Sequence, residues 1–261
     1  MTEISTVTGE RAAVAVRMDG GVCHIAFDRP EANNAINARL VADCHAALDA
    51  CEAEASVVVL SGSAETFCFG ADFAELSRGV DPFYANFAGP GPMFDLWQRM
   101  ATGPYVTLSY VRGKVNAGGM GFLGASDIVL ADTTARFSLS EMLFGLYPAC
   151  VMPFLVRRTG FQRAHYLTLS TQPIDASTAL AWGLADAIDE QGDMLLRRHL
   201  RQLARLSKTA VARYKTYATG LGPDWKAHRE RAIQGNLDVF EDPANRAAIT
   251  RYIDEGLFPW E

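Results

Sequence analysis

The first half of the chain alternates between short apolar runs and stretches with apolar side chains at helical spacing. Residues 12–30 read as two short strands around the tight turn Asp19-Gly20-Gly21. Residues 37–54 are amphipathic and predict a helix, with Asn37 as its N-cap. Further strands are expected in residues 56–62, 105–115 and 127–132, and further helices after Gly70, through residues 93–103 and after the glycines near residue 119.

The second half is expected to be mostly helical from Ser138 onward, apart from a short strand near residues 186–189. Helices are expected in residues 140–146, 153–160, 161–170, 175–183 and 193–206, followed by two or three more. Residues 78–92 are rich in Gly and Pro and predict a loop. Alternating strands and helices followed by helices alone indicate the α/β class, with a helical C-terminal part that forms a separate layer or docks on a neighbouring subunit.

The composition of the 261 residues is that of an ordinary globular protein, with 49% hydrophobic and 21% charged residues. The net charge of −6 argues against nucleic-acid binding, which normally needs a basic surplus. The five cysteines are scattered without C-x-x-C spacing, which indicates reduced thiols in a cytoplasmic protein. Charges interrupt the apolar runs of the N-terminal segment, so no signal peptide is expected, and no apolar stretch reaches the roughly 20 residues of a membrane helix.

The most informative motif is NAGGMGFLGASD, in residues 116–127. Its Gly119, Gly121 and Gly124 form the pattern G-x-G-x-x-G of dinucleotide-binding loops, and Glu141 follows where a ribose-binding acid would stand. The helix behind these glycines is too short, however, because a parallel crossover needs roughly a dozen residues or more. Two interpretations remain: the glycines let a helix pack closely on the sheet, or they expose backbone N–H groups.

A second glycine turn, FCFGADF in residues 67–73, also leads into an expected helix. Glycines at the start of a helix leave unpaired N–H groups, with the positive end of the helix dipole behind them. Two such turns that face each other donate one N–H each to a single oxygen and form an oxyanion hole. The spacing alone does not establish that these two turns face each other.

Other kinds of chemistry find little support in the sequence. The five histidines show no metal-ligand spacing, so no metal site is expected, and the G-x-S-x-G elbow of serine hydrolases is missing. Cys68 is interpreted as a packed thiol, because no histidine partner is specified. Four phenylalanines near the glycine turns are interpreted as core in preference to the wall of an acyl pocket: Phe69, Phe73, Phe137 and Phe144.

The two glycine turns, in this order, resemble those of the crotonase (enoyl-CoA hydratase/isomerase) superfamily. DRPEANNAIN (residues 28–37) is similar to its N-terminal motif, FSLSEMLFGLYP (137–148) to its downstream catalytic segment, and AWGLADAI (181–188) to its GLV landmark. The resemblance covers nearly the whole chain. It implies a crotonase-like spiral core of ββα units in residues 1–200 and a helical C-terminal trimerisation region in residues 201–261, in a homotrimer or hexamer.

The resemblance is closer still to one branch of the superfamily, the PksH-type dehydratases of polyketide β-branching. The segments that carry it include GKVNAGG (residues 113–119) and the terminal GLFPWE (256–261). It implies dehydration of 3-hydroxy-3-methylglutaryl-acyl carrier protein to 3-methylglutaconyl-acyl carrier protein. The carrier protein is then a partner, and no cofactor is expected, because the acyl thioester is carried on phosphopantetheine or CoA.

Residue by residue, the resemblance assigns the backbone N–H groups of Ala71 and Gly118 to an oxyanion hole. Glu141 corresponds to the second of the two glutamates of enoyl-CoA hydratases, and Gly121 stands at the position of the first. The usual Gly-Gly-Gly is also altered, since Ala117 replaces its first member and Asn116 precedes it.

Four positions are assigned to substrate binding by the same resemblance: Ala35, Phe69, Gly119 and Gly121.

Since one of the two glutamates is missing, we hypothesise that Glu141 takes the α-proton and passes it, or another proton, to the leaving hydroxyl on the same face. Asn116 is expected to orient that hydroxyl or a water. From the residues alone, Glu141 is better explained as a carboxylate in the first turn of a helix, after Ser138 and Ser140, where its charge interacts favourably with the helix dipole. The resemblance favours catalysis.

Two other functions remain open at this point. One is a CoA-dependent enoyl hydratase or isomerase, against which the missing glutamate at Gly121 and the terminal GLFPWE count. The other is a non-catalytic crotonase-like protein that binds acyl carrier protein, an alternative that Gly121 keeps open.

The distal carboxylate of the expected substrate needs a cationic or hydrogen-bonding partner. The candidates are Arg112, Lys114, Arg157 and Arg158, and each also reads as an ordinary solvated charge. The basic residues 197–215 are a candidate docking surface for an acidic carrier protein, or an ordinary solvated helix face.

Overall fold

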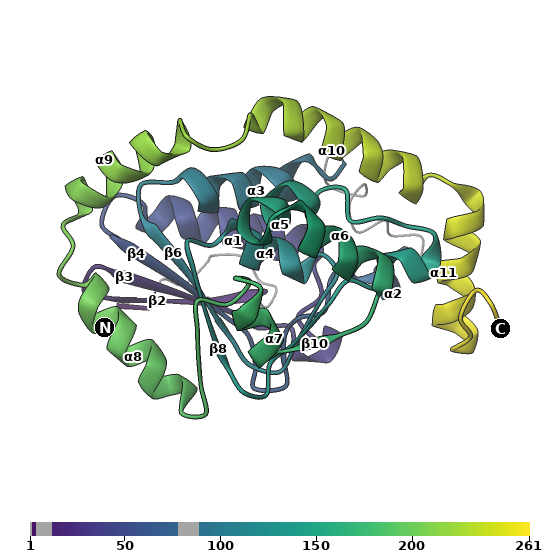
Figure 1. Ribbon diagram of the computed structural model, residues 1–261, viewed down its shortest axis with the longest axis horizontal. Helices are drawn as coiled ribbons and strands as arrows, with labels where there is room; N and C mark the ends of the chain where they lie inside the picture. Colours follow the sequence, from purple (N-terminus) through teal and green to yellow (C-terminus); the bar gives the residue numbers. More distant parts are fainter. Residues whose placement is uncertain (1, 4–11, 78–88) are drawn as a thin grey trace.

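Two β-sheets form the centre of the computed structural model, which describes residues 2–3, 12–77 and 89–261 (Figure 1). The larger sheet contains, in spatial order, β1 (Thr2–Glu3), β2 (Val14–Asp19), β3 (Val22–Phe27), β4 (Val57–Ser61), β6 (Val106–Val111), β8 (Ile128–Asp132) and β11 (Ala187–Asp189). The smaller sheet contains β10 (Ile174–Asp175), β9 (Arg136–Ser138), β7 (Lys114–Asn116) and β5 (Thr66–Cys68).

The chain moves between the two sheets in a repeated order. Each of β4, β6 and β8 is followed by a strand of the smaller sheet, β5, β7 or β9, and then by a helical segment: α2 (Phe73–Ser77), α4 (Gly119–Ala125) or η2 (Glu141–Phe144). Both sets of strands pair in parallel. This repetition is the crotonase spiral of ββα units, so the predicted α/β fold is confirmed. It also brings the starts of α2, α4 and η2 to one edge of the smaller sheet.

The first predicted elements agree closely with the structure. Strands β2 and β3 form an antiparallel hairpin around Gly20, whose φ of 58° favours glycine. Helix α1 (Ala38–Cys51) begins at Asn37, whose side chain accepts a hydrogen bond of 2.9 Å from the N–H of Leu40. The strand expected near residues 186–189 is β11.

The single strand expected in residues 105–115 is wrong. Gly113 has a φ of 61° and divides this stretch into β6 and β7, which belong to different sheets. A Cβ on Gly113 would lie 2.0 Å from the carbonyl oxygen of Glu65, so only glycine allows this close crossing. Strands β9 and β10 were not expected, because each is too short to show an alternating pattern.

The remaining helices cover the sheets and one end of the molecule: η1 (Pro30–Ala32), α3 (Gly91–Thr102), α5 (Met152–Thr159), α6 (Phe161–Ser170), α7 (Ala176–Ala181), α8 (Gly192–Leu203), α9 (Lys208–Thr219), α10 (Trp225–Phe240) and α11 (Pro243–Glu255). Figure 1 shows α9 and α10 passing over α3, and α11 reaching α2 at the end opposite α8. Most of the predicted loop in residues 78–92 lies outside the described residues. Helix α8 runs through residue 200, and the division into regions 1–200 and 201–261 stays a prediction.

An aromatic core joins α3, α4 and α5. The indole of Trp97 meets the rings of Phe122 and Phe154 edge-on, with both centroid distances 5.8 Å, and Phe122 lies 4.9 Å from Phe27.

Within the described residues, no helix is long and apolar enough to cross a bilayer.

Candidate active site

The two glycine turns meet at the edge of the smaller sheet. Gly70 ends the first turn with a φ of 93°, and a Cβ placed on it would lie 3.3 Å from the nitrogen of Gly118. A Cβ placed on Gly118 would lie 3.9 Å from the nitrogen of Ala71. The parallel pairing of β5 with β7 produces this approach, because each turn directly follows its strand. The structure therefore brings together the two N–H groups that the sequence could not place.

Neither of these N–H groups donates to a backbone carbonyl in the part of the chain that the structure describes. Around Ala71, the parallel bridge to Ile36 uses the carbonyl of Gly70 and the N–H of Asp72, so the N–H of Ala71 points to the other side. Gly118 is the N-cap of α4, where backbone N–H groups have no intrahelical acceptor. Two unpaired donors this close together at helix starts favour an anionic oxygen.

Ala117 holds the second turn in an unusual conformation. Its φ is 49°, in the left-handed region, where a residue other than glycine costs about 1 kcal/mol. Its N–H donates to the carbonyl of Ser138, with 3.1 Å between nitrogen and oxygen. Alanine in place of the family's usual glycine therefore leaves backbone strain at Ala117, directly before the N–H of Gly118.

Arg29 ties together the segments on either side of Ala71. Its guanidinium donates to the carbonyl of Ala35, next to Ile36, and to the carboxylate of Asp72 at 2.8 Å. The side chains of Arg29 and Asp72 are 13% and 7% exposed, so solvent screens this pair little. The same guanidinium lies 3.4 Å from Glu75 on α2. This network fixes the first turn, and the sequence showed Arg29 only as part of a family landmark.

Replacing Arg29 by alanine is expected to lower the free energy of unfolding by about 3–5 kcal/mol, because it leaves the buried carboxylate of Asp72 without its cation. Denaturant unfolding measures this change. The matched control is Arg17→Ala, whose pair with Asp19 is exposed and contributes about 1 kcal/mol or less. Equal stability of the two variants would contradict the role of the Arg29 network.

Glu141 begins η2 and lies beside the second turn. Strands β7 and β9 pair with Asn116 opposite Ser138, and the hydroxyl of Ser138 donates to Oδ1 of Asn116 at 2.8 Å. Nδ2 of Asn116 donates to the hydroxyl of Ser140 at 2.8 Å, which fastens the residue before Glu141. Asn116 therefore positions the segment that carries Glu141. Its expected contact with a hydroxyl or water stays a prediction.

The carboxyl group of Glu141 is buried. The residue is 9% exposed, and among the described residues its Oε2 atom is buried without a hydrogen-bond partner. Burial raises its pKa from 4.5 to about 7, against a smaller opposing effect of nearby backbone N–H groups. A carboxyl group that titrates near neutral pH can act first as a base and then as an acid.

The C-terminal segment of the same chain covers the helix that starts at Glu141. Phe144 of η2 contacts Phe73 of α2, with a centroid distance of 5.8 Å, and also Tyr252 and Phe258, at 5.1 and 5.9 Å. The side chain of Asn245 on α11 donates to the carbonyl of Gly145, which ends η2, at 3.2 Å. Helix α11 and Phe258 of the terminal GLFPWE therefore pack on η2, which begins at Glu141.

The four residues assigned to substrate binding lie around the two turns. Ala35 is 7% exposed, and Phe69 is 44% exposed, so the interpretation of Phe69 as core is wrong. Gly119 and Gly121 are buried, and a Cβ on either would lie 2.4 Å from the nearest atom, of Cys68 or Trp97 respectively. Both glycines thus allow close packing. Their contact with substrate stays a prediction.

Cys68 is a packed thiol, as expected. It is fully buried, and burial raises its pKa to about 12, so its thiolate is not formed near neutral pH.

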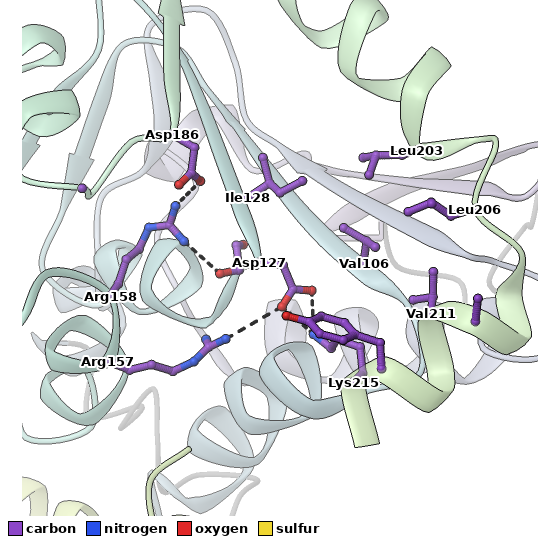
Figure 2. Close-up of a pocket in the computed structure, with 14 residues that line it drawn as sticks. Val106, Asp127, Ile128, Arg157, Arg158, Asp186, Leu203, Leu206, Val211 and Lys215 are labelled. Carbon is purple, nitrogen blue, oxygen red and sulfur yellow. Dashed lines mark hydrogen bonds and ion pairs between the residues drawn. The ribbon is translucent and has the colours of Figure 1, made fainter. Parts of the chain in front are cut away.

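Arg157 and Arg158 do not face Glu141. Arg157 donates to the carbonyl of Gly124 at 3.2 Å, and Arg158 donates to the carbonyl of Ser126 at 3.0 Å. Both carbonyls lie at the C-terminal end of α4, where the helix dipole stabilises positive charge. Both arginines line a cavity of about 680 Å³. Figure 2 shows Arg158 directed at Asp186. The donor Gly118 lies at the opposite end of α4. These two arginines are therefore unsuited to bind the distal carboxylate.

The other two candidates for the distal carboxylate are less constrained. Arg112 lies over the ring of Tyr110, 5.3 Å from its centroid, and Lys114 is exposed on β7. The choice between them stays open.

The basic segment 197–215 is divided by the structure. Lys215 is buried and donates to Asp127 at 2.5 Å, as Figure 2 shows, and Lys208 donates to the carbonyl of Ala55 at 2.7 Å. Exposed arginines remain at positions 197, 198, 201, 205 and 213. Figure 1 places α8, which carries three of them, at the opposite end of the molecule from α2 and α11. That placement does not favour this face as the docking surface for the site of the same chain.

Comparisons with known proteins agree with this geometry. Residues 17–261 match the family model described as enoyl-CoA hydratase/isomerase. The chain is 51% identical over 249 residues to the bacillaene synthase dehydratase PksH of Bacillus subtilis, covering 95% of this chain and 96% of that protein.

Solved structures give the same result. The crystal structure of the polyketide biosynthesis enoyl-CoA hydratase PksH from Bacillus subtilis matches with a TM-score of 0.90 and 50% identity, covering 95% of this chain and 99% of that one. A carnitinyl-CoA hydratase from Mycobacterium avium matches with a TM-score of 0.79 and 27% identity, over 95% and 97% of the two chains.

Proposed function

The chain belongs to the enoyl-CoA hydratase/isomerase family, and from this premise we propose that it is a dehydratase that removes water from a β-hydroxyacyl thioester in polyketide biosynthesis. The observation that carries the proposal is the buried Glu141, in a segment hydrogen-bonded to the turn that carries one of two neighbouring unpaired backbone N–H groups. A carboxylate and an oxyanion hole are the groups that proton abstraction next to a thioester carbonyl requires.

The N–H groups of Ala71 and Gly118 bind the thioester oxygen in this mechanism. Removal of the α-proton places negative charge on that oxygen as an enolate forms. The donors are already oriented by the two helix starts, so they stabilise the enolate without reorganisation.

Glu141 takes the α-proton as a carboxylate. The carboxyl group formed in this step then delivers a proton to the departing β-hydroxyl, which leaves as water. A pKa near 7 suits both steps, because neither protonation state is strongly favoured near neutral pH. One glutamate is sufficient when the proton removed and the hydroxyl expelled lie on the same face of the substrate.

The rate of dehydration is expected to depend on pH through Glu141 alone. The base must be ionised, so kcat/KM should fall about tenfold per pH unit below the raised pKa of about 7 and level off above it. Steady-state rates across the range where the protein is folded measure this profile. A half-point near 4.5, the ordinary value for a glutamate, would contradict the buried state of the group.

The proposed substrate is 3-hydroxy-3-methylglutaryl on an acyl carrier protein, and the product is 3-methylglutaconyl-acyl carrier protein. The 51% identical relative is a bacillaene synthase dehydratase, and its crystal structure is described as that of a polyketide biosynthesis enzyme, which supports dehydration in this kind of pathway. Turnover of the same acyl group on carrier protein and on CoA tests the choice of carrier. Equal kcat/KM on both would favour the CoA-dependent alternative, and binding of the carrier protein without turnover would favour a non-catalytic binder.

We also propose a cytoplasmic homotrimer or hexamer. All five cysteines are buried free thiols, which suits a reducing compartment. Large apolar side chains are exposed on α6, including Phe161 at 61%, Tyr166 at 55% and Leu169 at 57%, and such patches mark protein interfaces. Light scattering should give a mass three or six times 28.4 kDa, and a monomer at micromolar concentration would contradict the assembly.

A further inference from the structure

The space for a side chain at position 121 is already filled. Gly121 lies in the first turn of α4, where its N–H donates to the carbonyl of Gly118 at 3.0 Å. A Cβ on Gly121 would lie 2.4 Å from Cζ2 of Trp97 and 2.5 Å from both Cε2 and Cη2. These three carbons form the edge of the indole that ends in the nitrogen Nε1. The N–H edge of Trp97 therefore borders the first turn of α4.

The indole N–H of Trp97 is a buried donor without an acceptor. Trp97 is fully buried, and Nε1 has no hydrogen-bond partner among the described residues. The ring cannot turn freely, because Phe122 and Phe154 both meet it edge-on. A fixed and unsatisfied buried donor is destabilising unless a ligand or water pairs with it, so it marks a place where a polar group is expected to bind.

This donor borders the face of α4 that begins beside the two glycine turns. Residues three apart on a helix are neighbours on one face, and Gly118, whose Cβ would lie near the nitrogen of Ala71, is three residues before Gly121. Glu141 is fastened to the same turn through Ser138 and Asn116, and its Oε2 is also buried and unpaired in the described structure. An unpaired donor thus borders the first turn of α4, and an unpaired acceptor belongs to the segment that is hydrogen-bonded to the residues just before that turn.

We propose that the indole N–H of Trp97 binds the leaving β-hydroxyl of the substrate. This inference rests on the proposed dehydration. Glu141 takes the α-proton, the bond between the β-carbon and the hydroxyl breaks, and the hydroxyl leaves as water with the proton that Glu141 delivers. Trp97 keeps its own proton throughout, because an indole is a very weak acid. It stabilises the negative charge that develops on the departing oxygen.

The hydroxyl suits Trp97 better than the distal carboxylate does. The described contacts of the indole are aromatic, from Phe122 and Phe154, and a carboxylate in such a surrounding needs a cation or several donors. A hydroxyl is neutral in the bound substrate and needs a single donor as its bond to carbon breaks. Trp97 accordingly acts on the leaving group, and the carboxylate binds elsewhere.

The test compares two reactions in two variants. The first reaction is dehydration of the hydroxylated carrier-protein substrate. The second is exchange of the α-proton with deuterated water in 3-methylglutaryl-acyl carrier protein, which has no hydroxyl to expel. Trp97→Phe keeps an aromatic ring and removes the N–H. The matched control is Trp225→Phe, which removes an indole from the same aromatic core, where Trp225 stacks on Phe154.

Trp97→Phe is expected to lower kcat for dehydration by about 10- to 100-fold and to leave α-proton exchange unchanged. Trp225→Phe should leave both reactions unchanged. If Trp97→Phe fails to fold, β-(3-benzothienyl)alanine at position 97 keeps the shape of the indole with sulfur in place of N–H. This variant is also expected to lose dehydration and to keep α-proton exchange.

Dehydration at the wild-type rate in both position-97 variants would overturn the proposal. An equal loss of dehydration and exchange would also overturn it, because that result shows a packing role. A wild-type protein that exchanges the α-proton without dehydrating would instead overturn the proposed function, and the role of Trp97 with it.

Discussion

Replacement of Glu141 by glutamine is expected to lower kcat for dehydration by about 10²- to 10⁴-fold, because glutamine can neither take the α-proton nor deliver a proton to the leaving hydroxyl. The Glu141→Gln variant should also have a higher free energy of unfolding than the wild type above pH 7. The pKa of Glu141 is raised on folding, so the stability associated with its neutral form is complete below about pH 4.5 and is lost as the pH rises to about 7. The neutral amide avoids this loss, which amounts to about 3 kcal/mol.

The two readouts together separate catalysis from structure. Steady-state kinetics measure the first effect, and thermal unfolding at about pH 8 measures the second. Glu190→Gln, an exposed glutamate, is the matched control and should change neither. Near-normal dehydration by Glu141→Gln would contradict the assignment, and a large fall in its melting temperature would show that the carboxylate has a partner.

Replacement of Gly118 by proline is expected to lower kcat by about 100- to 1,000-fold, the effect of removing one oxyanion-hole donor. Proline has no N–H, and the φ of −51° at Gly118 lies within the range of its ring. The polarisation of the bound thioester gives a direct readout. The carbonyl stretch of 3-methylglutaryl-acyl carrier protein labelled with carbon-13 should shift to lower frequency in the wild type and less in the variant.

Gly118→Ala is the matched control for this experiment. It keeps the N–H, and its Cβ would lie 3.1 Å from Cδ1 of Ile36, the far end of a flexible side chain. Alanine should therefore retain most of the activity and the carbonyl shift. Equal shifts in the proline and alanine variants would show that Gly118 does not donate to the thioester oxygen.

The glycine turns illustrate what the pattern of the chain could predict. The two glycine turns indicated two helix starts with free N–H groups, and the structure has α2 and α4 there. Their proximity depends on the parallel pairing of β5 with β7, and β7 was hidden inside an apparently continuous strand of residues 105–115. The resemblance to a known family supplied the pairing that periodicity could not.

Trp97 and Arg29 show what the sequence left undetected. Trp97 lies in an amphipathic helix, where a buried tryptophan reads as ordinary core, and only three-dimensional packing places it against Gly121. Arg29 precedes the first oxyanion turn by about forty residues, so its contact with Asp72 has no local signal. Such long-range contacts arise from tertiary packing, which the hydrophobic pattern does not encode.

The C-terminal segment was left open between a separate layer and a neighbouring subunit. Within the described chain, Tyr252 and Phe258 pack on Phe144, three residues after Glu141. The sequence could not distinguish these two arrangements, because the aromatic side chains of the last helix and the tail would be buried in either one. The contact with η2 shows that the tail packs on its own chain, and a trimerisation role for residues 201–261 stays a prediction.

The intact mass of 3-hydroxy-3-methylglutaryl-acyl carrier protein before and after incubation with the enzyme shows whether the protein is a dehydratase. The carrier is expected to lose the mass of one water and to keep its distal carboxyl group, and Glu141→Gln should leave the mass unchanged. An unchanged mass with the wild-type protein, or loss of carbon dioxide together with water, would contradict it.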